Sequence, residues 1–256
     1  MTSPDSAAPR PNAEQQPSGE TLHGRLRPAT IAVAGGRPAP ERDAPVGPSI
    51  VLSSTYRGAG EPVPGERMYG RASNPTWDDF ESVLGQLEGS PLPSLAFASG
   101  VASISAVLSL VPLGGRVVVP VHVYMGTMTL VREAEQEGRI RVDAVEVTDT
   151  DTVLAAAEGA DLVLLESPTN PMLEVADLPE ILAGTRRLGV LSCVDSPFPT
   201  PLLQRPLAWG ADLVVHSATK YLAGHSDVVL GAATAVDPEL RQRLHAHRSR
   251  HGAIPG

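Results

Sequence analysis

The sequence predicts an α/β fold built around a mainly parallel sheet. Short, continuous apolar runs alternate along the chain with segments whose apolar residues recur at helical spacing. Strands that are apolar along their whole length are typical of parallel sheets, because helices cover both faces of such sheets. Strands that are joined in turn by helices place the chain among the α/β architectures.

Regular structure is expected from Thr76 onward. Thr76 is expected to cap a helix that is apolar at helical spacing and ends near Gly89. The expected strands occupy residues 95–98, 116–119, 142–147, 162–165, 190–194 and 213–215. The expected helices between them occupy residues 101–110, 127–136 and 178–188. Residues 76–256 are therefore expected to form one large domain.

The preceding part of the chain is expected to be irregular. Residues 1–24 are rich in Pro, Ser, Ala and Gln and predict a disordered arm, because they hold too little apolar surface to offset the entropy cost of ordering. Residues 25–75 contain repeated prolines that break any long element. An extended stretch of this length more often wraps a partner or carries function than fills a compact domain.

The composition of the chain limits which cellular compartment and which partners are expected. The net charge is -9 and the pI is near 5.2, which disfavours binding to nucleic acid or anionic lipid because both are polyanions. No stretch approaches the roughly 20 apolar residues of a membrane span, and the N-terminus lacks the apolar core of a signal peptide. The single cysteine, Cys193, leaves no intramolecular disulfide. A cytoplasmic protein without nucleic-acid or membrane partners is predicted.

Five histidines raise the question of a metal site. They are His216, His225, His245, His247 and His251. Their spacing matches no zinc signature, and Cys193 is far from the last three in sequence. We expect solvated helix histidines and no metal.

Polar residues follow five of the expected strands. They are Ser99-Gly100, Tyr124, Glu166-Ser167, Asp195 and the segment 217–220. Ligands of open parallel sheets bind at the carboxyl ends of the strands. Convergent polar groups at five strand ends are hard to assign to core packing, so this edge is the candidate site.

Two of these residues have chemistry of their own, each with an alternative. Asp195 ends an apolar run, where a carboxylate is costly unless it is paired. It either caps a turn or keeps the nitrogen of a bound heterocycle protonated, as pyridoxal phosphate requires. Lys220 is either a surface lysine or a nucleophilic amine, with the Ser217 and Thr219 hydroxyls available to a phosphate.

The other strand ends are less specific. Ser99-Gly100 precedes an expected helix, whose N-terminus can bind phosphate, although a plain strand-to-helix turn is the commoner meaning. Tyr124 offers an aromatic face for stacking on a cofactor ring, but a lone tyrosine is more often part of the core.

Together these residues resemble the Cys/Met-metabolism family of pyridoxal-phosphate (PLP) enzymes, which carry out trans-sulfuration. The matching segments are 69–76 (YGRASNPT), 97–100 (FASG), 124–127 (YMGT), 166–171 (ESPTNP), 195–201 (DSPFPTP) and 217–225 (SATKYLAGH). The resemblance runs from about residue 25 to the end. It implies the aspartate aminotransferase-like fold, fold type I, whose large domain has a mainly parallel seven-stranded sheet.

The resemblance also implies roles for individual residues. Lys220 corresponds to the lysine that holds PLP as a Schiff base and shuttles protons, Asp195 to the partner of the pyridine nitrogen, and Tyr124 to the stacking tyrosine and a base. The implied phosphate cradle consists of Ser99, Gly100, Val101, Ser217 and Thr219. Asn170 would lie near the phenolic oxygen of the cofactor.

The implied assembly is a homotetramer, a dimer of dimers. Tyr69 and Arg71 would reach the phosphate of a neighbouring subunit, which would explain the extended segment 25–75. Family members also have a smaller C-terminal domain with an arginine for the substrate carboxylate, and this domain is expected to be absent here. Gly126 stands where methionine γ-lyases have cysteine, and Met125, Ser196 and Pro197 also depart from the usual pattern.

The implied activity is elimination from cystathionine or a related γ-substituted amino acid, most like actinobacterial cystathionine γ-lyases. Two alternatives remain. One is γ-replacement on an O-acyl homoserine, as in cystathionine γ-synthase. The other is a truncated PLP-binding homologue without activity, which would act as a scaffold or regulator.

Overall fold

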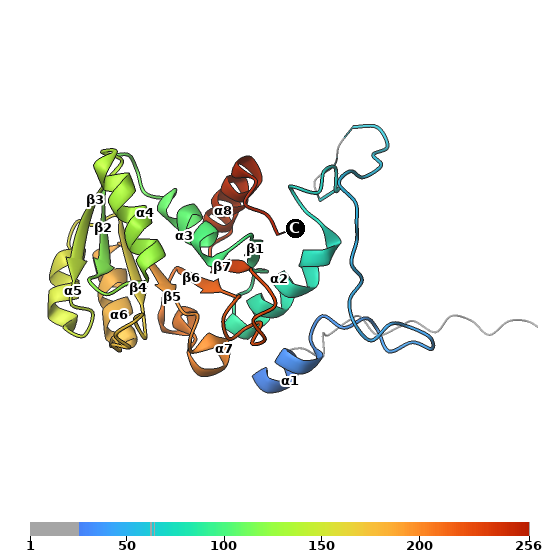
Figure 1. Cartoon of the computed structure of the whole chain (residues 1–256), viewed down its shortest axis with the longest axis horizontal. Coiled ribbons are helices and arrows are strands. Elements are labelled where there is room, and N and C mark those ends of the chain that lie inside the picture. The colour runs from blue at the N-terminus through green and yellow to red at the C-terminus, as the bar shows by residue number, and fades with distance from the viewer. Residues whose placement is uncertain (1–25, 62, 64, 256) are drawn as a thin grey trace, which may run out of the picture.

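A seven-stranded sheet forms the centre of the molecule (Figure 1). The computed structural model describes residues 26–61, 63 and 65–255, so the predicted arm at 1–24 lies outside the described residues. The strands are β1 (Leu95–Phe97), β2 (Gly115–Pro120), β3 (Ile140–Val145), β4 (Leu162–Glu166), β5 (Leu191–Asp195), β6 (Leu213–Ser217) and β7 (Gly231–Ala235). Their order is β1-β7-β6-β5-β4-β2-β3, and only β7 runs antiparallel to its neighbours. The predicted α/β class with a mainly parallel seven-stranded sheet is confirmed.

Helices connect the strands and cover the sheet. They are α1 (Pro28–Ala34), α2 (Pro75–Glu88), α3 (Gly100–Leu108), α4 (Met125–Gln136), α5 (Thr150–Ala157), α6 (Leu178–Leu188), α7 (Thr200–Leu203), the 3₁₀ turn η2 (Pro206–Trp209) and α8 (Pro238–His251). None of the helices in the described part of the chain combines the length and the apolar character needed to cross a bilayer.

The strands bury both of their faces, which explains their continuous apolar sequences. Along β2, Val117 and Val119 pack into a core with α3, α4 and α8, whereas Val118 points into a second core with α5 and α6 (Figure 1). All three valines are fully buried. The same alternation along β4 holds the sheet between two apolar layers, so the carboxyl ends of the strands are fixed in position.

Several elements differ from those expected. Asn74, not Thr76, caps α2: its side chain accepts a hydrogen bond from the Thr76 N–H, and the Thr76 hydroxyl accepts from the Val51 N–H. The short helix α1 interrupts the segment expected to be irregular. β7, with the sequence GAATA, was missed because strand propensity resides in β-branched and aromatic residues. Helices α5 and α8 were also missed.

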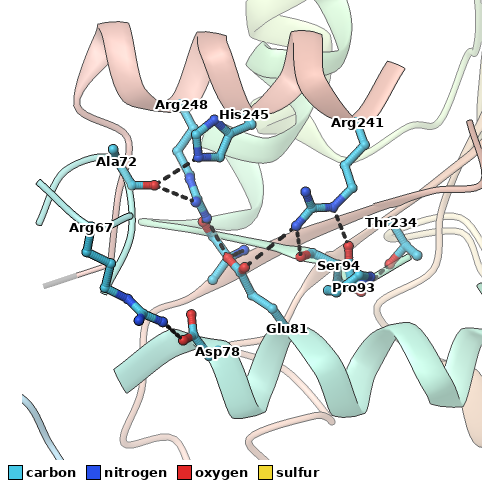
Figure 2. Close-up of polar contacts among 11 residues, drawn as sticks. Arg67, Ala72, Asp78, Glu81, Pro93, Ser94, Thr234, Arg241, His245 and Arg248 are labelled. Atoms are coloured by element: carbon cyan, nitrogen blue, oxygen red, sulfur yellow. Dashed lines mark hydrogen bonds and ion pairs between the residues drawn. The ribbon is translucent and has the colours of Figure 1, made fainter. Parts of the chain in front are cut away.

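Helix α8 is polar along most of its length and is held by a buried arginine (Figure 2). Arg248 is 1% exposed, and its Nη1 donates to Glu81 Oε1 at 2.5 Å and to the Ala96 carbonyl at 2.8 Å. Its guanidinium also lies 5.1 Å from the centre of the Trp77 ring. These contacts join α8 to α2 and to the edge strand β1.

The same helix holds the segment that precedes α2. The Ala72 carbonyl accepts hydrogen bonds from His245 Nε2 at 2.8 Å and from Arg248 Nη2 at 3.5 Å (Figure 2). The nearby Arg67–Asp78 ion pair is, by contrast, substantially exposed. Thus one buried cation organises the packing of three segments that are far apart in sequence.

We predict that Arg248→Ala lowers the free energy of unfolding by about 3 kcal/mol, because Glu81 would lose its buried charge partner and keep only the longer, 3.9 Å contact with Arg241. Urea unfolding followed by circular dichroism measures this loss. Arg67→Ala is the matched control, since removing an exposed ion pair costs at most about 1 kcal/mol. Equal losses in the two variants would contradict the role given to Arg248.

Candidate functional site

A cavity of about 240 Å³ opens at the carboxyl ends of the strands. Its walls come from the loops after β1, β2, β4, β5 and β6. It is lined by Ser99, Gly100, Val101, Ile104, Tyr124, Glu166, Asn170, Asp195, Pro197, Phe198, Ser217, Thr219, Lys220 and Val229. The structure therefore brings together nine of the eleven predicted site residues, and Tyr69 and Arg71 are the two that lie elsewhere.

One end of the cavity is formed by the N-terminus of α3. The Ser99 hydroxyl caps the helix by accepting from the Ala102 N–H at 3.1 Å. The Gly100 and Val101 amides precede the first intrahelical bonds and are available to an anion, which the helix dipole also favours. A Cβ at position 100 would lie 2.8 Å from Ser217 Cβ, so only glycine allows α3 to approach β6 this closely.

Two hydroxyl groups at the end of β6 and just after it differ in whether their protons are already engaged in hydrogen bonds. Thr219 Oγ1 donates to the Leu230 carbonyl and accepts from the Leu230 N–H, so its proton is already engaged. The Ser217 hydroxyl lines the cavity beside Gly100. A hydrogen-bond acceptor in the cavity would therefore meet Ser217 more readily than Thr219.

Lys220 extends from the turn that follows β6. Its backbone N–H donates to the Ser217 carbonyl at 3.0 Å, and its side chain is exposed where the cavity meets a neighbouring depression. It is the only lysine of the 256-residue chain, in which nineteen arginines supply the other basic side chains. The cavity thus contains the only side-chain primary amine.

Two neighbouring acidic residues also line the cavity. Glu166 and Asp195 are the last residues of β4 and β5 and are paired in register. Burial raises the pKa of Glu166 to about 7, against hydrogen bonds from the Tyr124 and Asn170 amides that lower it. Burial and the charge of Glu166 raise the pKa of Asp195 well above its usual range. Such a pair favours a cation, because each acid destabilises the charge of the other.

Glu166 also positions Tyr124. The Tyr124 N–H donates to Glu166 Oε2 at 2.6 Å, which fixes the start of α4 against β4. A Cβ at position 126 would lie 2.6 Å from the Tyr124 ring, so Gly126 leaves the space that the ring occupies. The ring borders the cavity and presents a surface to its contents.

Tyr69 and Arg71 line a separate depression together with Ile254 and Pro255. The Arg71 guanidinium lies 5.3 Å from the centre of the Tyr69 ring, and its Nη1 donates to the Ser249 carbonyl. These two side chains therefore do not reach the cavity of their own chain.

The expectation of solvated helix histidines is wrong for His216. This residue lies on β6 and is fully buried, with hydrogen bonds to the Ser196 carbonyl and to Glu88. His225 is exposed in a loop. His122, for which the sequence predicts no role, follows β2 and bonds to Glu174 in the loop after β4. His122, Glu174 and Glu146, which follows β3, lie close enough together to share a cation.

Sequence reasoning recognised Glu166 as a strand-end residue but gave it no role, and it missed Gly231. A Cβ at position 231 would lie 1.9 Å from the Ser99 carbonyl oxygen, so β7 can pass behind the start of α3 only with glycine there. The position of Glu166 could have predicted a role in the site. It is an acidic residue at the end of a fully apolar strand, where a carboxylate is costly unless it is paired, as for Asp195.

The sheet and its cavity define a protein of the PLP-dependent class with the mainly parallel fold described above. The chain belongs to the Cys/Met metabolism PLP-dependent enzyme family, whose model matches residues 29–256. Pyridoxal phosphate is the cofactor that membership of this family indicates.

Relatives with different named activities are similarly close. The chain is 39% identical to a cystathionine β-lyase of Lactococcus lactis over 228 residues, which cover 89% of the chain and 60% of the relative. It is 42% identical to the cystathionine γ-synthase of Escherichia coli over 218 residues, 84% of the chain and 56% of the relative. A cystathionine γ-lyase structure from Micromonospora echinospora has a TM-score of 0.83 and 38% identity, covering 90% of the chain and 61% of that structure. The chain thus spans about 60% of the length of these relatives.

The chemistry of the cavity fits pyridoxal phosphate. The cofactor has an aldehyde, a phosphate and a ring nitrogen that can carry a proton. The cavity offers one primary amine, the anion-binding start of a nine-residue helix, and two buried acids that favour a neighbouring cation. Gly100 is required by its close approach to Ser217, and it adds no side chain beside the amides at the start of this helix.

We predict that the chain without cofactor loses stability as the pH rises from about 4.5 to about 7. The folded chain keeps a proton on Glu166 in this window, whereas the unfolded chain has released it, so the free energy of unfolding falls with rising pH. Glu166→Gln, which is neutral throughout, should reduce this slope. Urea unfolding at several pH values measures it.

The control for this substitution is Glu158→Gln, which removes a carboxyl group at an exposed position. A Glu166→Gln variant with the same pH slope as the original chain would show that Glu166 does not hold a proton in the folded state.

Proposed function

We propose that this chain is the cofactor-binding part of a trans-sulfuration enzyme that carries out elimination on cystathionine or a related γ-substituted amino acid. The observation that carries the proposal is the convergence of Lys220 and Asp195 on the lining of one cavity of about 240 Å³. In this proposal residues 76–256 are the PLP-binding domain.

The residues that would hold the cofactor follow from the cavity. Lys220 would bind its aldehyde carbon, and Asp195 would hold a proton on its ring nitrogen. Tyr124 would cover the ring, and Asn170 would lie beside the phenolic oxygen. The phosphate would be held by Ser99, Gly100, Val101, Ser217 and Thr219, with the helix amides as the main donors.

Bound pyridoxal phosphate supplies an electron sink that stabilises negative charge at the α-carbon of an amino acid. Lys220 would take the α-proton and return protons to the substrate, since its amine lies at the open side of the cavity. Asp195, kept from water by burial, would fix the protonation of the ring nitrogen. Tyr124, which also lines the cavity, would act as a second base. A β-proton would then be removed, and the γ-thiol or γ-acyloxy group would leave with the electrons of its bond to the γ-carbon.

A second candidate is γ-replacement on an O-acyl homoserine. The 42% identity to a γ-synthase favours it, and the same cavity residues would serve both reactions. Adding cystathionine and measuring 2-oxobutanoate tests elimination, whereas adding an O-acyl homoserine with cysteine and measuring cystathionine tests replacement. A chain that binds the cofactor but forms neither product would be the non-catalytic scaffold or regulator, the other alternative named above.

We also propose a cytoplasmic homo-oligomer, a dimer of dimers, in which residues 25–75 lie at a subunit interface. The described part of this segment exposes large apolar side chains. They include Val46, Ile50, Leu52, Met68 and Tyr69. Tyr69 and Arg71, which face away from their own cavity, would complete the phosphate site of the neighbouring subunit.

We predict that Lys220→Ala abolishes the visible absorbance of the chain loaded with pyridoxal phosphate. Lys220 is the sole lysine, so no other side-chain amine can replace it. Lys220→Arg is the matched control: it keeps the positive charge but lacks a primary amine, and should lose the band equally. A visible band that survives either substitution would exclude the assignment.

We predict that Lys220→Ala and Arg71→Ala chains, each deficient alone, regain cofactor binding when they are co-expressed. If Arg71 serves the neighbouring site, a mixed dimer contains one site with both residues intact. Cofactor bound per mixed dimer measures the effect. Placing both substitutions on one chain and co-expressing it with the original chain is the control, because that mixed dimer has no intact site. Absence of complementation would contradict a cross-subunit role.

A further inference from the structure

A buried histidine–glutamate pair lies directly behind the cavity. His216 Nε2 on β6 is 2.5 Å from Glu88 Oε1, at the end of α2, and neither side chain is exposed to solvent. Burying two ionisable groups is costly unless they satisfy one another. The two residues are 128 positions apart in sequence, so the pair exists only because the fold brings α2 against the sheet.

The contacts of His216 determine which of its nitrogens carries a proton. Nδ1 lies 2.9 Å from the Ser196 carbonyl oxygen, which can only accept, so Nδ1 must be the donor. The Nε2–Oε1 contact must also hold one proton, because two bare acceptors would repel at that distance. The pair is therefore neutral overall, whether this second proton resides on the imidazole or on the carboxyl group.

Glu88 has little other reason to be buried. Among the described residues its second oxygen, Oε2, finds no hydrogen-bond partner. An unsatisfied buried acceptor costs on the order of 1–3 kcal/mol, so an apolar residue would suit this place better if only packing mattered. The polar role of Glu88 is confined to orienting the His216 ring.

The His216 ring acts on the turn that carries Asp195. The next residue, Ser196, donates its N–H to the Val215 carbonyl at 3.0 Å and accepts from His216 Nδ1 through its own carbonyl. Two consecutive residues of β6 thus clamp both backbone polar groups of Ser196, and its hydroxyl accepts a hydrogen bond from Gln204 Nε2 at 3.0 Å. Sheet pairing with Glu166 and Val215 holds Asp195 itself, and this clamp holds the next residue in the chain, which sets the direction in which the chain leaves Asp195.

We propose that His216, oriented by Glu88, is a positioning residue that aims the Asp195 carboxyl group at the ring nitrogen of the cofactor. The inference rests on the proposed function. It assigns His216 no contact with the cofactor or with substrate: its effect passes through the Ser196 carbonyl. Loss of the Nδ1 donor should let the turn relax and should weaken the hold of Asp195 on the ring nitrogen.

Two substitutions separate the contacts of His216. The amide nitrogen of asparagine is as many bonds from Cα as Nδ1, so His216→Asn keeps the donor to Ser196 and loses Glu88. The amide nitrogen of glutamine matches Nε2, so His216→Gln keeps the contact with Glu88 and loses the donor. A purely structural role would affect the two variants alike.

The readout is the nitrogen resonance of ¹⁵N-labelled pyridoxal phosphate bound to the full chain, which reports whether the ring nitrogen is protonated. We expect His216→Asn to keep the original resonance. His216→Gln should move it toward that of an unprotonated pyridine and weaken cofactor binding about tenfold, the effect of losing one hydrogen bond of about 1.4 kcal/mol. Unfolding midpoints of both variants monitor the fold.

Asp195→Asn is the reference that separates the two proposals. If Asp195→Asn moves the resonance and His216→Gln does not, the positioning role is overturned while the role of Asp195 stands. If Asp195→Asn leaves the resonance unchanged, the proposed function of the site fails with it. Should His216→Gln not fold, the double variant His216→Leu with Glu88→Leu decides, because it removes the Nδ1 donor together with the buried carboxyl group and should also move the resonance. An unchanged resonance there overturns the proposal.

Discussion

The central constraint of this molecule is the parallel pairing of β4 with β5, which ends with two acids side by side. Glu166 and Asp195 share a register position, both are buried, and both have raised pKa values. Packing alone does not explain two acids at neighbouring positions of the sheet, because the charge of each raises the free-energy cost of ionising the other. In the proposed function, a cationic ring nitrogen beside these acids would resolve the conflict, and the other features of the cavity fit a ligand that carries one.

The rest of the fold holds the carboxyl ends of β4 and β5 in place. Glycines at 100 and 231 let α3, β6 and β7 approach within distances that a side chain would prevent. Behind the acids, the buried His216 ring ties β6 to the Asp195 turn and to α2. Farther away, Arg248 ties the last helix to α2 and β1. These buried polar contacts add fixed connections between the helices and the sheet that carries the site.

Much of the fold and of the candidate site could be predicted from the sequence, because buried parallel strands have continuous apolar sequences that are easy to recognise. Apolar runs such as that of β4 and the polar residues that follow them revealed both the sheet and its functional edge. β7 was hidden because its alanines and glycine have no strand preference, and α8 because it buries mainly one leucine and an arginine. The cap at Asn74 and the His216–Glu88 pair depend on tertiary contacts that no local pattern encodes. Cross-subunit roles for Tyr69 and Arg71 came from family resemblance alone, and the structure places both away from their own cavity.

The central claim is that one amine and one acid of this chain serve the same cofactor. The most direct test is borohydride reduction of the chain loaded with pyridoxal phosphate, followed by mass spectrometry of its peptides. Because the chain has a single lysine, the only competing amine is the N-terminal amino group. We expect one phosphopyridoxyl group per chain, on the peptide that contains Lys220. A label on the N-terminal peptide, or no stable label, would contradict it.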